Sequence, residues 1–280
     1  MIKSLLIKVY NFYLKKKREL EWLRQVHYWR KRIPFKETKP IDNDASYLIL
    51  APHSDDEWIG CSQIIKTCKD VIILNMDMQG GDTEEMHRTR YLEMETLASK
   101  YGRRLLTVGN EKEISLAEII AEVKPDFICL PFFFDWHPEH IRVMKFLNQA
   151  LLNSLYQGRI LMYQVSLPID SGFVNVSAPM SKEELGDKWS TFKETYKTQT
   201  MIAYKRFMAN ERINGAISGA YAAEVYVALE VSAWHESLDK LLLTPCEIDE
   251  VKSNLMDLTL TRNNVIKYVD KRRISMSVFA

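Results

Sequence analysis

The chain has 280 residues, of which 46% are hydrophobic and 27% charged, a composition typical of a folded globular protein and not of a disordered or low-complexity chain. It has no run of about 18 apolar residues, which argues against a membrane-spanning helix, and its four scattered cysteines argue against a disulfide framework and favour a reducing compartment. The net charge of +1 conceals an asymmetry, because residues 1–33 carry a net charge of +8 and the remainder carries −7.

The basic N-terminal segment, residues 1–33, has the apolar spacing of a helix. The apolar residues that recur at helical intervals include Leu5, Leu6, Val9, Phe12 and Tyr13. Pro34 and Pro40 indicate the end of this helix and a short connector. We therefore expect a helical extension over residues 1–40 and a second unit, the main domain, over residues 41–280.

Three interpretations of the positive charge of residues 1–33 stay open at this stage. The helix packs on the main domain or on a second copy in a homo-oligomer, or it lies on an anionic membrane surface. Nucleic-acid binding is the least favoured, because the rest of the chain is acidic and shows no recognition motif.

From residue 46 the pattern alternates between short apolar runs and amphipathic stretches. Strands are expected at 47–52, 71–76, 104–108, 126–131 and 160–165, and helices at 59–68, 84–101, 116–123 and 140–155. Beyond residue 181 the pattern predicts helices at 181–209, 218–232, 247–258 and 262–270. Strands that alternate with helices predict an α/β fold, a Rossmann-like three-layer sandwich with a mostly parallel sheet and a helical C-terminal part.

A polar cluster follows the first expected strand directly and contains His53, Asp55, Asp56 and Glu57. Ligands bind outside the carboxyl ends of strands in an open parallel sheet, so these side chains stand where a site is expected. Carboxylates this close raise one another's pKa, and a divalent metal would remove that cost. The alternative is a solvated turn in which an Asp caps the following helix.

A second cluster, which contains His137 and His140, follows the strand expected at 126–131. Zinc favours histidine nitrogen and carboxylate oxygen, and catalytic zinc sites use three protein ligands and a water molecule. The two clusters together indicate a metal site, although the same ligand types also accept Fe²⁺, Mn²⁺ or Co²⁺.

The two clusters resemble the motifs of the LmbE-like de-N-acetylases, a family that includes N-acetylglucosaminyl-phosphatidylinositol de-N-acetylase. The matching segments are Pro52-His53-Ser54-Asp55-Asp56-Glu57 and His137-Pro138-Glu139-His140, with softer matches at Arg90-Tyr-Leu-Glu93 and Tyr196-Lys-Thr198-Gln199. The resemblance covers about residues 46–230, and it identifies residues 41–280 as the catalytic domain. Ser54 and Glu139 depart from the family, which has Pro and Asp at these positions.

The resemblance implies a role for each residue of the two clusters. It implies zinc ligation by His53, Asp56 and His140. It also implies that Asp55 is the general base and that His137, when protonated, stabilises the oxyanion of the reaction or acts as the acid. Arg90 would contact the substrate sugar or its phosphate.

We therefore expect a cytoplasmic, zinc-dependent hydrolase that removes the N-acetyl group from an N-acetylglucosamine-type conjugate and gives acetate and a free amine. A peripheral position at the inner face of the membrane is an alternative location. The alternative functions are hydrolysis of another amide at the same zinc site, or a non-catalytic sugar-binding or membrane-associated relative. Two further expectations concern Trp136, which we interpret as a core residue, and Glu224, which needs a partner if it is buried.

Overall fold

The computed structural model describes residues 2–78, 83–152, 154–200 and 202–272, and these residues form eight strands and ten helices. The strands are β1 (Lys39–Pro40), β2 (Ser46–Ala51), β3 (Asp70–Asn75), β4 (Arg104–Thr107), β5 (Phe127–Pro131), β6 (Arg159–Tyr163), β7 (Val176–Met180) and β8 (Ala222–Glu230). The helices are α1 (Ile2–Arg30), α2 (Asp56–Thr67), α3 (Glu84–Lys100), α4 (Lys112–Val123), α5 (Pro138–Leu152), α6 (Lys182–Thr195), α7 (Tyr204–Asn214), α8 (Val231–Leu241), α9 (Pro245–Asn254) and α10 (Leu258–Arg272).

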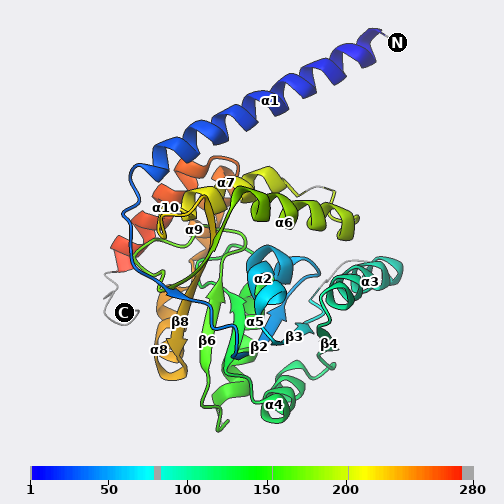
Figure 1. Cartoon of the computed structure of the whole chain (residues 1–280), viewed down its shortest axis with the longest axis vertical. Coiled ribbons are helices and arrows are strands. Elements are labelled where there is room, and N and C mark those ends of the chain that lie inside the picture. Colours follow the sequence, from blue (N-terminus) through cyan, green and yellow to red (C-terminus); the bar gives the residue numbers. More distant parts are fainter. Residues whose placement is uncertain (1, 79–82, 153, 201, 273–280) are drawn as a thin grey trace.

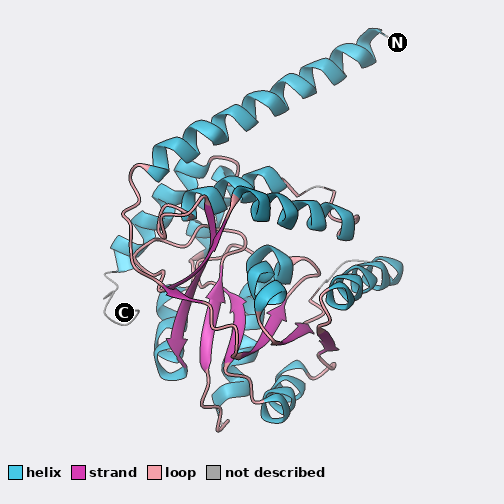
Figure 2. Ribbon diagram, viewed as in Figure 1, coloured by secondary structure: helices cyan, strands magenta, loops and turns pink. Residues whose placement is uncertain are grey.

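The strands form one mostly parallel sheet in the order β1-β7-β8-β6-β5-β2-β3-β4, with helices on both of its faces (Figure 2). Strand β2 shows how the layers arise, because successive side chains of a strand point to opposite faces. Leu48 and Leu50 pack in the core that α4, α5, α8 and α10 cover, whereas Tyr47 and Ile49 pack against α2, α3 and α6. This arrangement confirms the α/β three-layer fold that the sequence predicts.

The order in which strands are added to the sheet reverses between β2 and β5, which are parallel neighbours at the middle of the sheet. From β2 the chain continues to β3 and β4 on one side, and from β5 it continues to β6 on the other. Such a switch point opens a crevice at the carboxyl ends of the two strands. Both polar clusters of the sequence begin at this crevice.

The helix predicted at 218–232 is wrong, because residues 222–230 form the strand β8. Strand β8 lies between β6 and β7 and pairs antiparallel with both. It is buried along almost its whole length, and its sequence is apolar except for Glu224 and Glu230, so periodicity does not distinguish it from a buried helix. Strand β7 was not predicted either, and the helix predicted at 181–209 divides into α6 and α7.

Helix α1 contacts the rest of the molecule through its C-terminal half. Trp22, Val26 and Trp29 are buried against α7 and α10. The indole nitrogen Nε1 of Trp22 donates a hydrogen bond to the Met256 carbonyl at 2.9 Å, and that of Trp29 donates to Thr259 Oγ1 at 3.2 Å. The N-terminal half extends away from the domain (Figure 1). Among the described residues, no helix is both long and apolar enough to cross a membrane.

Candidate metal centre and catalytic cleft

The crevice between β2 and β5 brings together the residues that the two sequence clusters contributed. They line a cleft of about 500 Å³, which lies within the usual range for small-molecule sites. The predicted site residues in its lining are His53, Asp55, Asp56, Arg90, His137 and His140.

The turn between β2 and α2 is strained at Asp55, whose backbone has φ 152° and ψ −24°. Non-glycine residues rarely adopt positive φ, and such strain persists only where surrounding contacts hold it. The Asp55 N–H donates hydrogen bonds to the His53 carbonyl at 3.1 Å and to Glu57 Oε2 at 3.0 Å. Glu57 is fully buried and also accepts a hydrogen bond from the Tyr196 hydroxyl at 2.5 Å. These contacts hold the backbone of Asp55 in its strained conformation.

Three atoms that can coordinate a metal ion converge on one point at the base of the cleft. Asp56 Oδ2 lies 3.0 Å from His53 Nδ1 and 3.2 Å from His140 Nε2, and the two nitrogens are 3.2 Å apart. A tetrahedral zinc ion with bonds of about 2.0–2.1 Å separates its ligand atoms by about 3.3 Å. The spacing of the three atoms is close to that of three zinc ligands, and it is also the spacing of hydrogen bonds between the groups.

The opposite nitrogens of the two rings face carboxylates. His53 Nε2 lies 2.5 Å from Glu139 Oε2, and His140 Nδ1 lies 2.8 Å from Asp135 Oδ2. A carboxylate accepts hydrogen bonds, so these outward ring nitrogens carry protons, and the converging nitrogens are the ones that a cation would bind. Carboxylates that orient histidines in this way are typical of metal centres.

The sequence did not reveal this pair of carboxylates. No role for Asp135 follows from the sequence, and Glu139 stands out there only as a departure from the family motif. Glu139 Oε2 lies 4.0 Å from His137 Nδ1 and pairs with His53. The only signal in the sequence was the presence of carboxylates beside histidines, a common combination at metal sites.

His137 stands beside the converging atoms, with its ring centroid 4.5 Å from that of His53. His53, His137 and His140 each offer a nitrogen within 4.8 Å of the others, so His137 also lies within reach of a metal. Burial and the neighbouring imidazoles of His140 and His53 lower the pKa of His137 to about 4. This shift favours the neutral ring in the metal-free protein, because burial disfavours the charged form. The protonated His137 that the resemblance implies stays a prediction.

The adjacent carboxyl groups of Asp55 and Asp56 are driven in opposite directions. Burial and the nearby charges of Asp56 and Glu57 raise the pKa of Asp55 well above its ordinary value. Burial also opposes ionisation of Asp56, but its contacts with His140 and His53 hold the pKa of Asp56 low. Carboxyl groups with separated pKa values are suited to different roles, one as a permanent anion and one in proton transfer.

The two weaker sequence matches, residues 90–93 and 196–199, are joined by hydrogen bonds beside the cleft. The Glu93 carboxylate accepts hydrogen bonds from the Thr198 N–H at 2.9 Å and from its hydroxyl at 2.6 Å. Gln199 Nε2 donates to the Ser54 carbonyl at 3.4 Å, and the Ser54 hydroxyl donates to the Arg90 carbonyl at 2.8 Å. The segment 196–199 thus connects α3, which carries Arg90, to the strained turn.

Trp136 packs against the core, as we expected, but it also lines the cleft. Its ring lies below the ammonium group of Lys252, which is 5.5 Å from the ring centroid. Trp136 therefore forms part of the wall that a substrate would meet.

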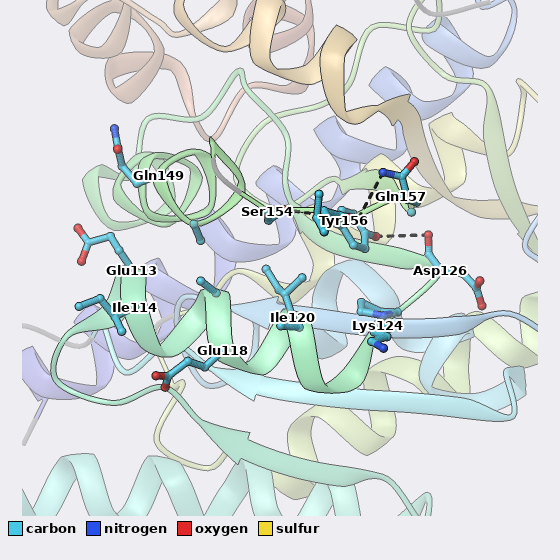
Figure 3. A pocket seen from close by; sticks show the side chains of 16 residues that line it. Glu113, Ile114, Glu118, Ile120, Lys124, Asp126, Gln149, Ser154, Tyr156 and Gln157 are labelled. Atoms are coloured by element: carbon cyan, nitrogen blue, oxygen red, sulfur yellow. Dashed lines mark hydrogen bonds between the residues drawn. The ribbon is translucent and has the colours of Figure 1, made fainter.

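A larger cavity of about 1200 Å³ lies elsewhere, between α4, α5 and the segment that leads to β6 (Figure 3). Tyr156 lies in this cavity, and its hydroxyl donates hydrogen bonds to the carbonyls of Asp126 and Arg159 at 3.4 and 3.1 Å. The described residues that line it include no histidine or cysteine. The smaller cleft, where titratable groups converge, is thus the better candidate for chemistry.

Comparison with known proteins identifies similar folds. A conserved protein from Thermus thermophilus matches with 22% identity and a TM-score of 0.51, over 65% of this chain and 93% of that one. The A40926 pseudoaglycone deacetylase matches with 14% identity and a TM-score of 0.49, over 66% and 96% of the two chains. The zinc-inhibited form of teicoplanin deacetylase matches with 10% identity and a TM-score of 0.47, over 66% and 98%. No family model and no curated protein matches the sequence. The Thermus protein supports the fold and nothing more.

Proposed function

We propose that this protein is a zinc-dependent hydrolase that removes the N-acetyl group from an N-acetylglucosamine-type conjugate, giving acetate and a free sugar amine. The observation that carries the proposal is the convergence of His53 Nδ1, Asp56 Oδ2 and His140 Nε2, which lie 3.0–3.2 Å apart at the base of an open cleft. A buried Asp beside that point supplies the proton acceptor that amide hydrolysis needs, and a neighbouring His supplies a hydrogen-bond donor.

His53, Asp56 and His140 would hold the metal in this proposal. In the metal-free protein the two rings lie between carboxylates, and these contacts raise the pKa of both against the opposing effect of burial. A divalent cation would replace the two inward-facing ring protons and leave the outward hydrogen bonds to Glu139 and Asp135 intact. When bound there, zinc supplies a Lewis acid for the amide carbonyl and lowers the pKa of a water molecule.

The remaining chemistry belongs to side chains of the cleft. Asp55, held by its strained backbone, accepts the proton of the attacking water. His137 donates a hydrogen bond from its ring to the developing oxyanion, where a fixed donor stabilises the transition state. The proton that Asp55 has accepted then reaches the leaving amine.

Arg90 would contact the sugar or a phosphate attached to it. It lines the cleft from α3, and the bracing segment 196–199 lies beside it through Ser54 and Glu93. A guanidinium group suits bidentate contacts with phosphate or carboxylate.

The decisive experiment combines metal analysis of the full chain, purified without chelator, with acetate release from N-acetylglucosamine in free, nucleotide-linked and lipid-linked form. We expect about one zinc per chain, the number that a single three-ligand site holds, and acetate release from at least one substrate. His140→Ala should lose both metal and activity, whereas His27→Ala, a change at an exposed histidine of α1, should lose neither.

Two results would overturn the proposal. Absence of metal, together with absence of activity after zinc is added, would favour a non-catalytic relative. Release of an amine without acetate, from an amide other than an acetamido sugar, would assign the same site to another amidohydrolase reaction.

A further inference from the structure

Helix α1 presents an unusual concentration of exposed apolar side chains. In the described part of the chain, nine of the eighteen exposed large apolar residues belong to this one helix. Five of them form a stripe in which each side chain is between 49% and 62% exposed: Val9, Phe12, Tyr13, Leu20 and Leu23. Exposed apolar patches of this kind indicate an interaction surface.

The stripe does not overlap the face by which α1 packs on the domain. At 100° per residue, its five members centre about a third of a turn away from the buried residues Trp22, Val26 and Trp29. The docked half of the helix is fixed, and the remainder extends beyond the domain (Figure 1). The stripe is thus held in a defined orientation and left uncovered by the described residues.

Basic residues surround this stripe. Lys15 and Lys17 flank it on its two sides, and Lys16 lies within it, all three being exposed. Long lysine side chains bury their apolar stems and extend their ammonium groups toward an aqueous boundary. An apolar stripe bordered by lysines, with Phe12 and Tyr13 among its members, is suited to the boundary between lipid tails and head groups.

One flank of the helix continues this positive surface onto the catalytic domain. A groove of about 610 Å³ lies between α1 and the segment that joins α6 to α7. Its basic lining residues are Lys15, Arg18, Lys193, Lys197 and Lys205, and its acidic lining residue is Glu19, which pairs with Lys16 and Lys205. The groove shares Gln199 and Ile202 with the metal-site cleft, so this surface adjoins the candidate active site.

We propose that the exposed stripe of α1 binds an anionic lipid surface. Charge selects this occupant over a second copy of the chain. Pairing two such helices would bring together two segments that each carry +8 and would place Lys16 of one copy against the other. An anionic membrane supplies the opposite charge to the lysines and an apolar phase to Phe12 and Leu20.

Co-sedimentation of the full chain with lipid vesicles tests this proposal without reference to enzymatic activity. We expect binding to phosphatidylcholine vesicles that contain phosphatidylglycerol, and much weaker binding to pure phosphatidylcholine. The triple change Lys15→Gln, Lys16→Gln, Lys17→Gln should lower the partition coefficient about a hundredfold. Phe12→Ser with Tyr13→Ser should lower it as well, because the stripe would lose its aromatic members.

The matched control removes three exposed lysines from other helices: Lys145→Gln, Lys182→Gln and Lys240→Gln. It should leave vesicle binding unchanged, and circular dichroism melting should show that every variant stays folded. Equal binding to both vesicle types, insensitive to the lysine changes, would overturn the proposal. So would an oligomer in sedimentation velocity that Phe12→Ser dissociates while no vesicle binding occurs, since the partner would then be a second copy.

Discussion

Two clusters of buried charge contact helix α2, one at its N-terminus and one at its middle, and they differ in how completely their members are paired. In the middle cluster, the Lys188 ammonium group donates to the Ile59 carbonyl at 2.7 Å and to the carboxylates of Glu211 and Glu224 at 2.5 Å each. Its three protons therefore have three acceptors. The two carboxylates have further donors, which include Trp189 Nε1 at 2.6 Å and the Tyr226 hydroxyl at 2.6 Å.

The cluster at the N-terminus of α2 is incomplete by the same criterion. Its carboxylates are those of Asp55, Asp56, Glu57, Asp135 and Glu139, and they face three imidazoles and the charge of Arg90. His137 Nδ1 is buried and has no hydrogen-bond partner among the described residues. The cluster at the middle of α2, here called the closed cluster, is complete without a ligand, so it stabilises the fold. In the cluster at the N-terminus, here called the open cluster, carboxyl groups outnumber the basic side chains and His137 Nδ1 has no hydrogen-bond partner among the described residues, so this cluster is suited to bind a cation.

The largest effect should come from Asp55→Asn, which removes one charge from the open cluster and keeps its shape. We expect turnover to fall by about 10²–10⁴-fold, the usual contribution of a general base. Metal content should stay at the wild-type level, because the three converging atoms are untouched. The metal-free variant should be at least as stable as the wild type, because the change removes a like charge beside Asp56.

Acetate release, metal analysis and thermal melting of the same preparation check these expectations for Asp55→Asn. Metal loss equal to that of His140→Ala would show that Asp55 is a ligand and not a base.

Removal of one charge from the closed cluster should lower the stability of the protein. Lys188→Met leaves Glu211 and Glu224 buried without their cation, and we expect a loss of about 3–5 kcal/mol in the free energy of unfolding. Urea denaturation measures the loss. Lys182→Met, at an exposed position of the same helix, should change the stability by less than about 0.5 kcal/mol. Equal stability of the two variants would contradict the structural role of the closed cluster.

The two clusters were not equally visible in the sequence. The open one follows β2 and β5, which are short apolar runs that end in polar residues, and parallel strands bring their carboxyl ends to one edge. The sequence therefore predicts that its principal residues lie close together, and the structure brings them to one cleft. The sequence does not show that Asp135 and Glu139 are their outer partners, because the pairing depends on side-chain directions across two elements.

The sequence indicated the closed cluster only indirectly. The sequence indicated that a buried Glu224 needs a partner, and the structure supplies Lys188. That partner could not be identified, since Glu224 was placed in a helix and it lies in fact on β8. The alanine-rich run that contains it favours a helix locally, and pairing with β6 and β7 overrides this preference. Local sequence patterns thus indicate the candidate site residues but not strand β8, which completes the sheet.

A smaller effect is expected from Asp135→Asn, which weakens the outer support of the open cluster. The amide retains the shape but removes the charge that holds His140, and we expect metal affinity to fall about 10–100-fold. Competition with a chromogenic chelator measures the affinity. Asp126→Asn provides the control, because Asp126 accepts hydrogen bonds from Ser46 at the opposite end of the sheet. A variant of Asp135 with wild-type affinity would show that its carboxylate does not orient a ligand.

The smallest effect concerns Thr198→Val, at the brace between the cleft and α3. The change removes the hydroxyl donor to Glu93 and keeps the backbone donor, so unfolding should cost about 1 kcal/mol less. Thr89→Val, which alters an exposed hydroxyl of α3, is the matched control. If Arg90 contacts substrate, the variant should raise KM and leave kcat unchanged, because binding weakens equally in the ground and transition states. A fall in kcat at constant KM would show that the hydrogen bonds between Thr198 and Glu93 act through the strained turn, and thus through the position of Asp55.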